Sequence, residues 1–247
     1  MIKVVKIGGH VLDDAVALQD FCGRFAALPG QKVLVHGGGA MASRLQEALG
    51  QTPVKIAGRR VTDSDTLQVV TMAYAGWCNK LIVSSLQAQG CNAMGLSGCD
   101  ANVISASKRA PLDGVDYGFV GDVTPASVNC AVLCSLLDQG ITPVLSPINH
   151  DGSGQLLNTN ADTVAASVAS ALGAELLLCF EKDGVLDASG NVIPAITAAD
   201  FEVLKADGTI SEGMIPKLSN AFSALRSGTA SVRICPFTLS SGTTVTP

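Results

Sequence analysis

Two lysines and an aspartate, widely separated along the chain, are the residues best suited to carry out chemistry. Lys6 comes just before Gly8 and Gly9. Lys217 ends the segment E-G-M-I-P-K, and Asp162 ends the segment N-T-N-A-D. Glycine has no Cβ, so backbone N–H groups there can close on a phosphate, and phosphoryl transfer also needs cations. The pattern predicts a phosphotransfer site in which Asp162 positions the lysines, although Asp162 alone also fits a simple helix N-terminal carboxylate.

A second glycine-rich turn, Gly37-Gly38-Gly39, follows an apolar run and precedes a helical pattern. Its N–H groups and the helix dipole would form an anion site. The same segment satisfies the dinucleotide fingerprint G-x-G-x-x-G/A, which makes an oxidoreductase an alternative. Arg59 and Arg60 stand where an acidic residue is expected for NAD, an arrangement that would tolerate NADP. That alternative gives the two lysines and the aspartate no role.

The elements that must position these residues alternate between buried strands and helices. Continuous β-branched and aliphatic runs predict parallel strands at 2–7, 32–36, 141–145 and 175–180, and the right-handed crossover rule makes the first two parallel. Asp13-Asp14 is expected to cap the first helix, and Thr62 or Ser64 a later helix that runs through Met72 towards Gln89. Hairpins are expected within 52–62, 100–123 and 149–157. The predicted fold is an α/β/α three-layer arrangement, with an open, mainly parallel sheet between helices and ligands at the carboxyl ends of the strands.

One domain is expected over 1–247, divided into two lobes. The first lobe, 1–146, would hold the glycine turns. The second, 147–247, would hold the run that ends in Glu181-Lys182-Asp183-Gly184. The join falls near the segment between Pro143 and Pro147.

Composition excludes several classes of protein. The 247 residues are 47% hydrophobic, with 16 Lys+Arg against 21 Asp+Glu, and no basic run indicates a nucleic-acid partner. No targeting segment and no apolar run of about 18 residues is present, so we expect a cytoplasmic protein.

The eight cysteines include no C-x-x-C pair, and the three histidines have no ligand spacing, so reduced thiols and no metal site are predicted. Walker A and protein-kinase motifs are also absent from the sequence.

Four motifs occur in a fixed order: K-I-G-G at 6–9, V-H-G-G-G at 35–39, N-T-N-A-D at 158–162 and E-G-M-I-P-K at 212–217. G-R-R-V-T stands at 58–62. Each motif is weak alone, but the ordered set resembles the amino acid kinase family, and within it the acetylglutamate kinases, over essentially the whole chain.

The resemblance implies roles for individual residues. Lys6 and Lys217 would stabilise the transferring phosphoryl group, with Asp162 arranging both. Gly38, Gly39, Arg60 and Asn158 would bind the acyl amino acid, Arg60 holding its α-carboxylate in bidentate fashion. The ATP-binding residues would be Gly8, Gly9, Glu181, Lys182, Asp183, Gly184, Val185, Leu186, Thr209, Ile210 and Ser211.

The implied reaction is attack by the γ-carboxylate of N-acetyl-L-glutamate, or a related N-acylglutamate, on the γ-phosphoryl of ATP with Mg²⁺, in arginine biosynthesis. A carboxylate is already ionised at neutral pH, so no general base is needed. Mg²⁺ would be held mainly by phosphates and water. Whether the acyl group is acetyl or succinyl stays open.

Two further expectations concern assembly and class. Arginine-inhibited members of the family carry an extra helix before the first strand, and this chain begins at the strand. A homodimer without arginine feedback is therefore expected. A non-catalytic nucleotide or amino-acid sensor on the same fold is the second candidate function.

Overall fold

An eight-stranded sheet forms the centre of the protein, as a computed structural model shows for residues 1–56, 58–112, 114–210 and 214–246. The strand order is β12-β14-β13-β11-β1-β2-β8-β5, and all pairs are parallel except β13 with β14. The strands are β1 (Lys3–Ile7), β2 (Lys32–His36), β5 (Ala93–Leu96), β8 (Thr142–Leu145), β11 (Glu175–Phe180), β12 (Ala195–Ile196), β13 (Ser231–Pro236) and β14 (Thr243–Val245). The predicted open, mainly parallel sheet is confirmed.

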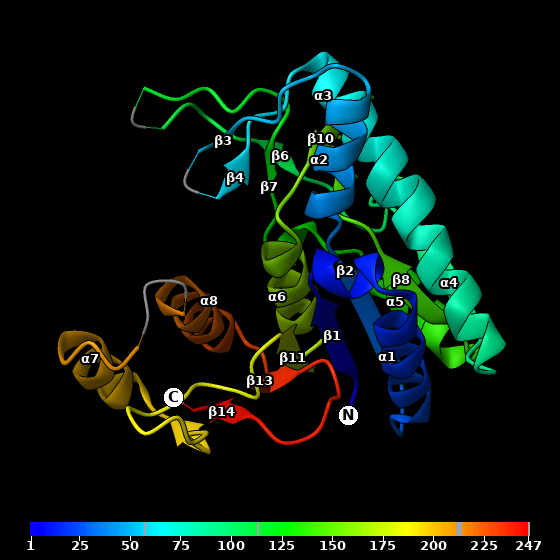
Figure 1. The fold of residues 1–247 in the computed structure, drawn as a ribbon. Helices are drawn as coiled ribbons and strands as arrows, with labels where there is room; N and C mark the ends of the chain where they lie inside the picture. The colour runs from blue at the N-terminus through cyan, green and yellow to red at the C-terminus, as the bar shows by residue number, and fades with distance from the viewer. Residues whose placement is uncertain (57, 113, 211–213, 247) are drawn as a thin grey trace.

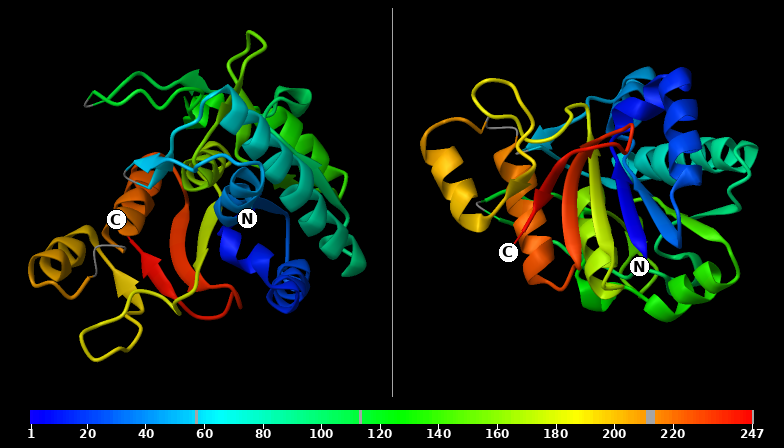
Figure 2. Two further views of the ribbon diagram at one scale, coloured as in Figure 1. Left: turned by 45° about the horizontal axis from the view of Figure 1, so that its top comes forward. Right: turned by 90° about the horizontal axis from the view of Figure 1, so that it is seen from below.

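Helices cover both faces of this sheet, as Figures 1 and 2 show. Alternate strand residues pack on opposite faces: Val4 joins a core with α5, α6 and α8, whereas Val5 joins a core with α1 and α4. The helices are α1 (Ala15–Ala27), α2 (Gly39–Ala48), α3 (Ser64–Thr71), α4 (Asn79–Ala88), α5 (Cys130–Asp138), α6 (Ala161–Ala171), α7 (Ala198–Ala206) and α8 (Ile215–Arg226). The three-layer prediction is therefore confirmed.

Three small hairpins lie beyond the carboxyl ends of the central strands, at the top of Figure 1. They pair β3 (Lys55–Ile56) with β4 (Arg59–Arg60), β6 (Ser107–Lys108) with β7 (Gly121–Asp122), and β9 (Ile148–His150) with β10 (Leu156–Asn158). The first two fall within ranges predicted for hairpins, and the third extends the predicted range 149–157 by one residue at each end. They extend the molecule on the side where ligands of parallel sheets bind.

Local side-chain chemistry explains where the helices begin. Of the predicted pair Asp13-Asp14, it is Asp14 that caps α1, by accepting hydrogen bonds from the N–H groups of Val16 and Ala17. For the helix at 64 the sequence suggested Thr62 or Ser64 as the cap. The cap is Asp63, whose carboxylate accepts from Thr66 N at 2.8 Å.

One long helix was predicted from about 64 to 89, and the structure interrupts it. A π-helix, Met72–Cys78, stands between α3 and α4. The extra residue in a π-turn shifts the faces that the flanking helices present. Tyr74 and Cys78 thereby face the glycine turn after β2.

Other expectations can be compared with the described residues. The eight cysteines are free thiols, and no described group of His, Cys, Asp and Glu side chains is arranged to hold a metal ion. Within the described ranges, no helix is long and apolar enough to cross a membrane. The sheet continues between the two expected lobes through the pairing of β1 with β11, so the division into lobes stays a prediction.

Candidate active site

The two N-terminal glycine turns meet at the carboxyl edge of the sheet. Strands β1 and β2 pair in parallel with Ile7 opposite His36, so both turns leave the sheet at the same level. Gly37 N donates to Ile7 O at 3.0 Å. A Cβ built on Gly9 would lie 3.4 Å from Gly39 N, which leaves little room for a side chain. The turns therefore form one continuous backbone surface.

His36 and Asn79 fix the second turn from inside the protein. The His36 ring is fully buried, with Nδ1 2.7 Å from Gly37 O and Nε2 3.1 Å from Asn79 Nδ2. Asn79 Nδ2 also donates to Val144 O at 3.0 Å. Burial lowers the pKa of His36 from 6.5 to about 4, so the imidazole is neutral at pH 7. A neutral ring can donate through Nδ1 and accept at Nε2.

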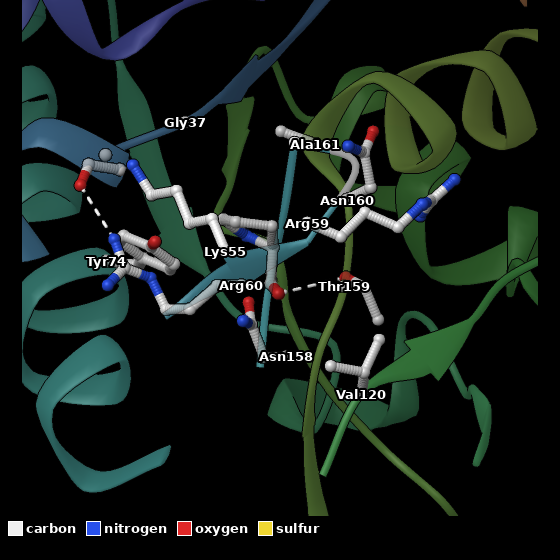
Figure 3. A pocket seen from close by; sticks show the side chains of 14 residues that line it. Gly37, Lys55, Arg59, Arg60, Tyr74, Val120, Asn158, Thr159, Asn160 and Ala161 are labelled. Atoms are coloured by element: carbon white, nitrogen blue, oxygen red, sulfur yellow. Dashed lines mark hydrogen bonds between the residues drawn. The ribbon is translucent and has the colours of Figure 1, made fainter. Parts of the chain in front are cut away.

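A cavity of about 190 Å³ opens beside this turn (Figure 3). Its charged lining side chains are all cationic: Lys55, Arg59 and Arg60, all from the β3–β4 hairpin. Gly38 and Gly39 form another part of the wall, at the start of α2, where backbone N–H groups lack intrahelical partners. A cavity with this lining suits a small ligand that carries carboxylates.

Arg60 is held in place by α2. Its Nη2 donates to Gly39 O at 2.9 Å and to Ser43 Oγ at 2.8 Å, and its Nη1 donates to the side chain of Gln46. Its Nε is buried without a hydrogen-bond partner among the described residues. A buried unpaired donor in a ligand cavity is a group that an anion can satisfy. Bidentate binding by Arg60 would use this Nε and require exchange of a present contact at Nη2.

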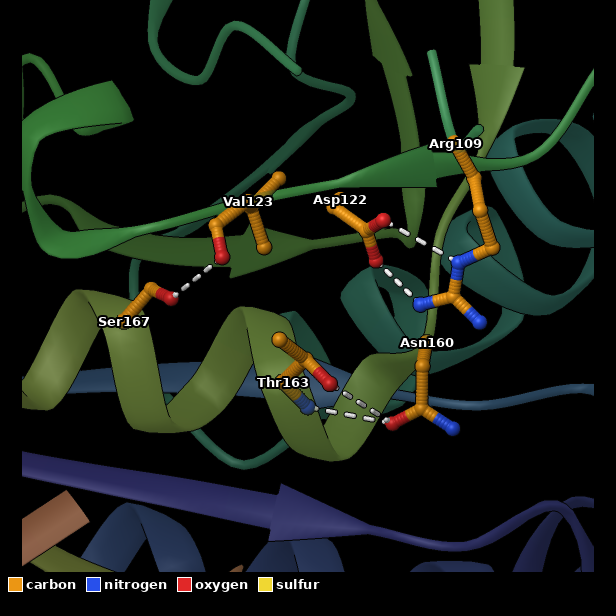
Figure 4. Close-up of polar contacts among 6 residues, drawn as sticks. All are labelled: Arg109, Asp122, Val123, Asn160, Thr163 and Ser167. Carbon is orange, nitrogen blue, oxygen red and sulfur yellow. Dashed lines mark hydrogen bonds and ion pairs between the residues drawn. The ribbon is translucent and has the colours of Figure 1, made fainter. Parts of the chain in front are cut away.

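The segment N-T-N-A-D connects this cavity to the catalytic candidates. Asn158 lines the cavity at the end of β10, and its amide donates to Thr62 Oγ1 at 3.0 Å. Asn160 caps α6: its Oδ1 accepts from Asp162 N at 2.9 Å and from Thr163 N at 3.1 Å. Figure 4 shows the contact with Thr163. The cap fixes the first turn of α6 and so places Asp162 one residue beyond the wall of the cavity.

Lys6 and Asp162 form a direct ion pair. Lys6 Nζ lies 2.9 Å from Asp162 Oδ1, and the side chains are 9% and 30% exposed. Lys6 comes from β1 and Asp162 from the first turn of α6, which packs on β1. The predicted pairing of this lysine with this carboxylate is present in the structure.

Lys217 reaches the same place from α8. Its Nζ lies 3.7 Å from the centroid of the Phe180 ring, and Lys6 Nζ lies 5.5 Å from that same centroid. Asp162, Phe180 and Lys217 also line one small cavity. Burial and the charge of Lys6 lower the pKa of Lys217, while the carboxylates of Asp162 and Glu181 partly offset this. The two ammonium groups therefore face one region.

The lowered pKa of Lys217 leads to a pH prediction. A lysine whose pKa is lowered loses its proton, and with it its ability to stabilise phosphate charge, at a lower pH than an ordinary lysine. Because Glu181 raises this pKa, Glu181→Gln is expected to move the alkaline limb of the kcat profile to lower pH. Glu202→Gln, on α7 beside Lys205, is the matched control. An alkaline limb that stays in place in Glu181→Gln would contradict the assignment.

Four of the residues predicted to bind ATP, 181–184, follow Phe180 directly along the chain. Residues 181–183 are exposed and follow Phe180 at the end of β11. A Cβ on Gly184 would lie 2.8 Å from Thr243 Oγ1 and 2.9 Å from Val192 Cγ1, so the position fits only glycine.

The side chains of Val185 and Ile210 are packed in the core, while Leu186 and Thr209 are half-buried. Ser211, with Glu212 and Gly213 of the last motif, lies outside the described residues.

Sequence reasoning missed several residues that the structure brings into the site. The sequence predicts Phe180 only as the last residue of a strand, yet its ring contacts both lysines. Tyr74, Gln46 and Lys55 were not singled out, although the first and last line the cavity and Gln46 holds Arg60. For Phe180 the sequence offers one signal: an aromatic side chain at the carboxyl end of a buried strand, where parallel sheets bind ligands.

Known proteins share this sequence and fold. Residues 1–236 match the model of the amino acid kinase family. The chain is 48% identical over 241 residues to an acetylglutamate kinase of Cytophaga hutchinsonii, covering 95% of this chain and 90% of that protein. It is 49% identical over 240 residues to an acetylglutamate kinase of Bacteroides thetaiotaomicron, covering 94% and 92%.

Solved structures agree with the fold. The crystal structure of smu.665 from Streptococcus mutans has a TM-score of 0.83 and 32% identity, covering 99% of this chain and 98% of that one. An N-acetylglutamate synthase of Neisseria gonorrhoeae, complexed with coenzyme A and N-acetyl-glutamate, has a TM-score of 0.85 at 23% identity, covering 100% of this chain and 59% of that one. The second likeness bears on the fold alone. With the family model matching nearly the whole length, the chain belongs to the amino acid kinase family.

Proposed function

We propose that this protein is an acetylglutamate kinase: it transfers the γ-phosphoryl group of ATP to the γ-carboxylate of N-acetyl-L-glutamate, or of a closely related N-acyl-L-glutamate. The products are an acyl phosphate and ADP. Support comes from relatives named acetylglutamate kinase that are 48–49% identical over 94–95% of the chain. Membership in a kinase family also implies that ATP is the donor.

One structural observation carries the proposal. The ammonium groups of Lys6 and Lys217 lie over the same Phe180 ring, next to a cationic cavity and two glycine turns. In the reaction a bond forms between a carboxylate oxygen and the γ-phosphorus, and the bond from phosphorus to the bridging oxygen of ADP breaks. Two cations and backbone donors can stabilise the charge on the phosphoryl oxygens as this happens.

The acceptor needs no proton removed, because a carboxylate is ionised at neutral pH. This agrees with a site whose buried histidine, His36, is occupied by Gly37 and Asn79. ATP would enter as its Mg²⁺ complex. Asp162 is paired with Lys6, and no described cluster of protein ligands could hold a metal, so phosphates and water would supply most of the coordination.

The test is release of ADP and formation of an acyl phosphate, trapped as its hydroxamate, from ATP and candidate acceptors. N-acetyl-L-glutamate and N-succinyl-L-glutamate should be compared, since the identity of the acyl group is part of the proposal. Free glutamate is the control acceptor. Acceptor-dependent ADP release is expected; binding of both ligands without turnover would instead support the sensor alternative. The homodimer, the cytoplasmic location and the lack of arginine feedback stay predictions.

A further inference from the structure

The π-helix Met72–Cys78 sets the shape of the substrate cavity. It places the Tyr74 ring directly against Gly38: a Cβ on Gly38 would lie 2.6 Å from Tyr74 Cδ1 and 3.2 Å from Cys78 Sγ. Real Cβ atoms do not approach other atoms so closely, so the turn and the aromatic ring fit together only with glycine at 38. π-Turns inside α-helices are frequently found at functional sites. Here the π-turn brings a bulky side chain against the Gly37–Gly39 turn of the substrate cavity.

Tyr74 also touches the cation that faces the cavity. The residue is 6% exposed, lines the cavity, and has its ring beside the Arg60 guanidinium in Figure 3. Burial raises the pKa of Tyr74, while the positive charge of Arg60 partly offsets this. The phenol is therefore neutral at physiological pH, with its oxygen next to the guanidinium.

Tyr74 thus connects the two ends of the substrate site. In the predicted binding mode, the acceptor carboxylate of the substrate lies against Gly38 and Gly39, and its α-carboxylate lies against Arg60. In a glutamate skeleton two methylene groups separate the α-carbon from the acceptor carboxylate. Productive transfer needs both ends held at a fixed separation, because a small misplacement of reacting groups costs a large factor in rate. A rigid buried ring that contacts both Gly38 and Arg60 fixes that separation.

We propose that Tyr74 is a positioning residue for the acyl amino acid, acting through Arg60 and Gly38 to match the cavity to a substrate with two carboxylates in a glutamate-like spacing. The inference rests on the proposed kinase function. Ser43, Gln46 and Gly39 hold the other edges of the same guanidinium. Tyr74 adds the contact that relates this cation to the glycine turn.

The test compares Tyr74→Phe with the wild-type protein in steady-state kinetics. Phenylalanine keeps the ring against Gly38 and removes the hydroxyl beside Arg60. The KM for the acylglutamate is expected to rise about tenfold, because the guanidinium loses the polar neighbour that keeps it aligned with the substrate, with kcat and the KM for ATP changed less than about twofold. Trp77→Phe is the control, because Trp77 lies on the same π-helix but is 61% exposed.

A second arm distinguishes positioning from general loss of structure. In an Arg60→Lys background, Tyr74→Phe should raise this KM by less than about twofold, because the two changes remove the same interaction. Provided that the wild-type protein is active, two results would overturn the inference. One is that the two substitutions multiply each other's full effect on the KM for the acylglutamate, and the other is that the KM for ATP rises equally. If the wild-type protein turns over no acylglutamate, the proposed function fails first and the inference with it.

Discussion

Replacing Lys6 or Lys217 with alanine is expected to lower kcat by about a hundredfold to a thousandfold, the range found when one preorganised charge-stabilising donor is removed from an active site. Both ammonium groups lie over Phe180, where the transferred phosphoryl group is to pass. Their charge is worth most in the transition state, so kcat should fall far more than the KM for either substrate rises. Steady-state kinetics with ATP and the acylglutamate measure this.

The two variants need different controls. Lys6→Ala leaves the carboxylate of Asp162 without its partner, so Lys6→Ala combined with Asp162→Asn separates a loss of charge balance from a loss of catalysis. For Lys217→Ala the control is Lys205→Ala, which removes a half-exposed lysine of the neighbouring helix α7. Thermal unfolding should show that each variant is folded. Turnover within about threefold of wild type in both lysine variants would refute the catalytic assignment.

The second large effect concerns acid stability and His36. Its pKa is lowered from 6.5 to about 4, chiefly by burial, so the folded protein resists protonation that the unfolded chain accepts. Between pH 6.5 and pH 4 the unfolded state binds more protons, and stability therefore falls as the pH falls through this window. The full difference corresponds to about 3 kcal/mol in the free energy of unfolding.

Urea unfolding at a series of pH values measures this dependence. His36→Gln removes the titrating group, so its stability should change less than that of wild type between pH 6.5 and pH 4. The variant should be less stable than wild type at pH 7, because the contacts with Gly37 and Asn79 are altered. His150→Gln is the control, since His150 lies on the β9–β10 hairpin and bonds to Asn102. An unchanged acid dependence in His36→Gln would exclude this residue as the cause.

Local sequence signals were sufficient for most of the framework. Glu175–Phe180 and the Asp14 cap follow from short-range patterns, and the structure has both. Helix α7 was missed although Thr197 and Asp200 form a capping box. Among its residues only Phe201 is buried, so the segment has no apolar stripe of helical period to detect. A helix with so little burial is recognised only when its neighbours are known.

The candidate site shows a similar division. Lys6, Asp162, Lys217, Arg60 and Asn158 were named from motifs, and the structure groups them around two adjoining cavities. The π-helix at 72–78 could not be predicted, because its position depends on how Tyr74 and Cys78 pack against Gly38, which lies far earlier in the chain. The hydrophobic pattern of the helix itself gives no sign of that contact.

The sequence by itself determined most of the strands and helices along the chain, the two N-terminal glycine turns and the identity of the charged groups, because strand burial, glycine flexibility and side-chain charge are properties of short segments. Only the tertiary structure decided that Lys6 and Lys217 share the Phe180 ring, and that Arg60 is held by Gln46 and Ser43. Those contacts join residues from different elements. They depend on how β1, α2, α6 and α8 pack around the sheet, which no short stretch of the chain encodes.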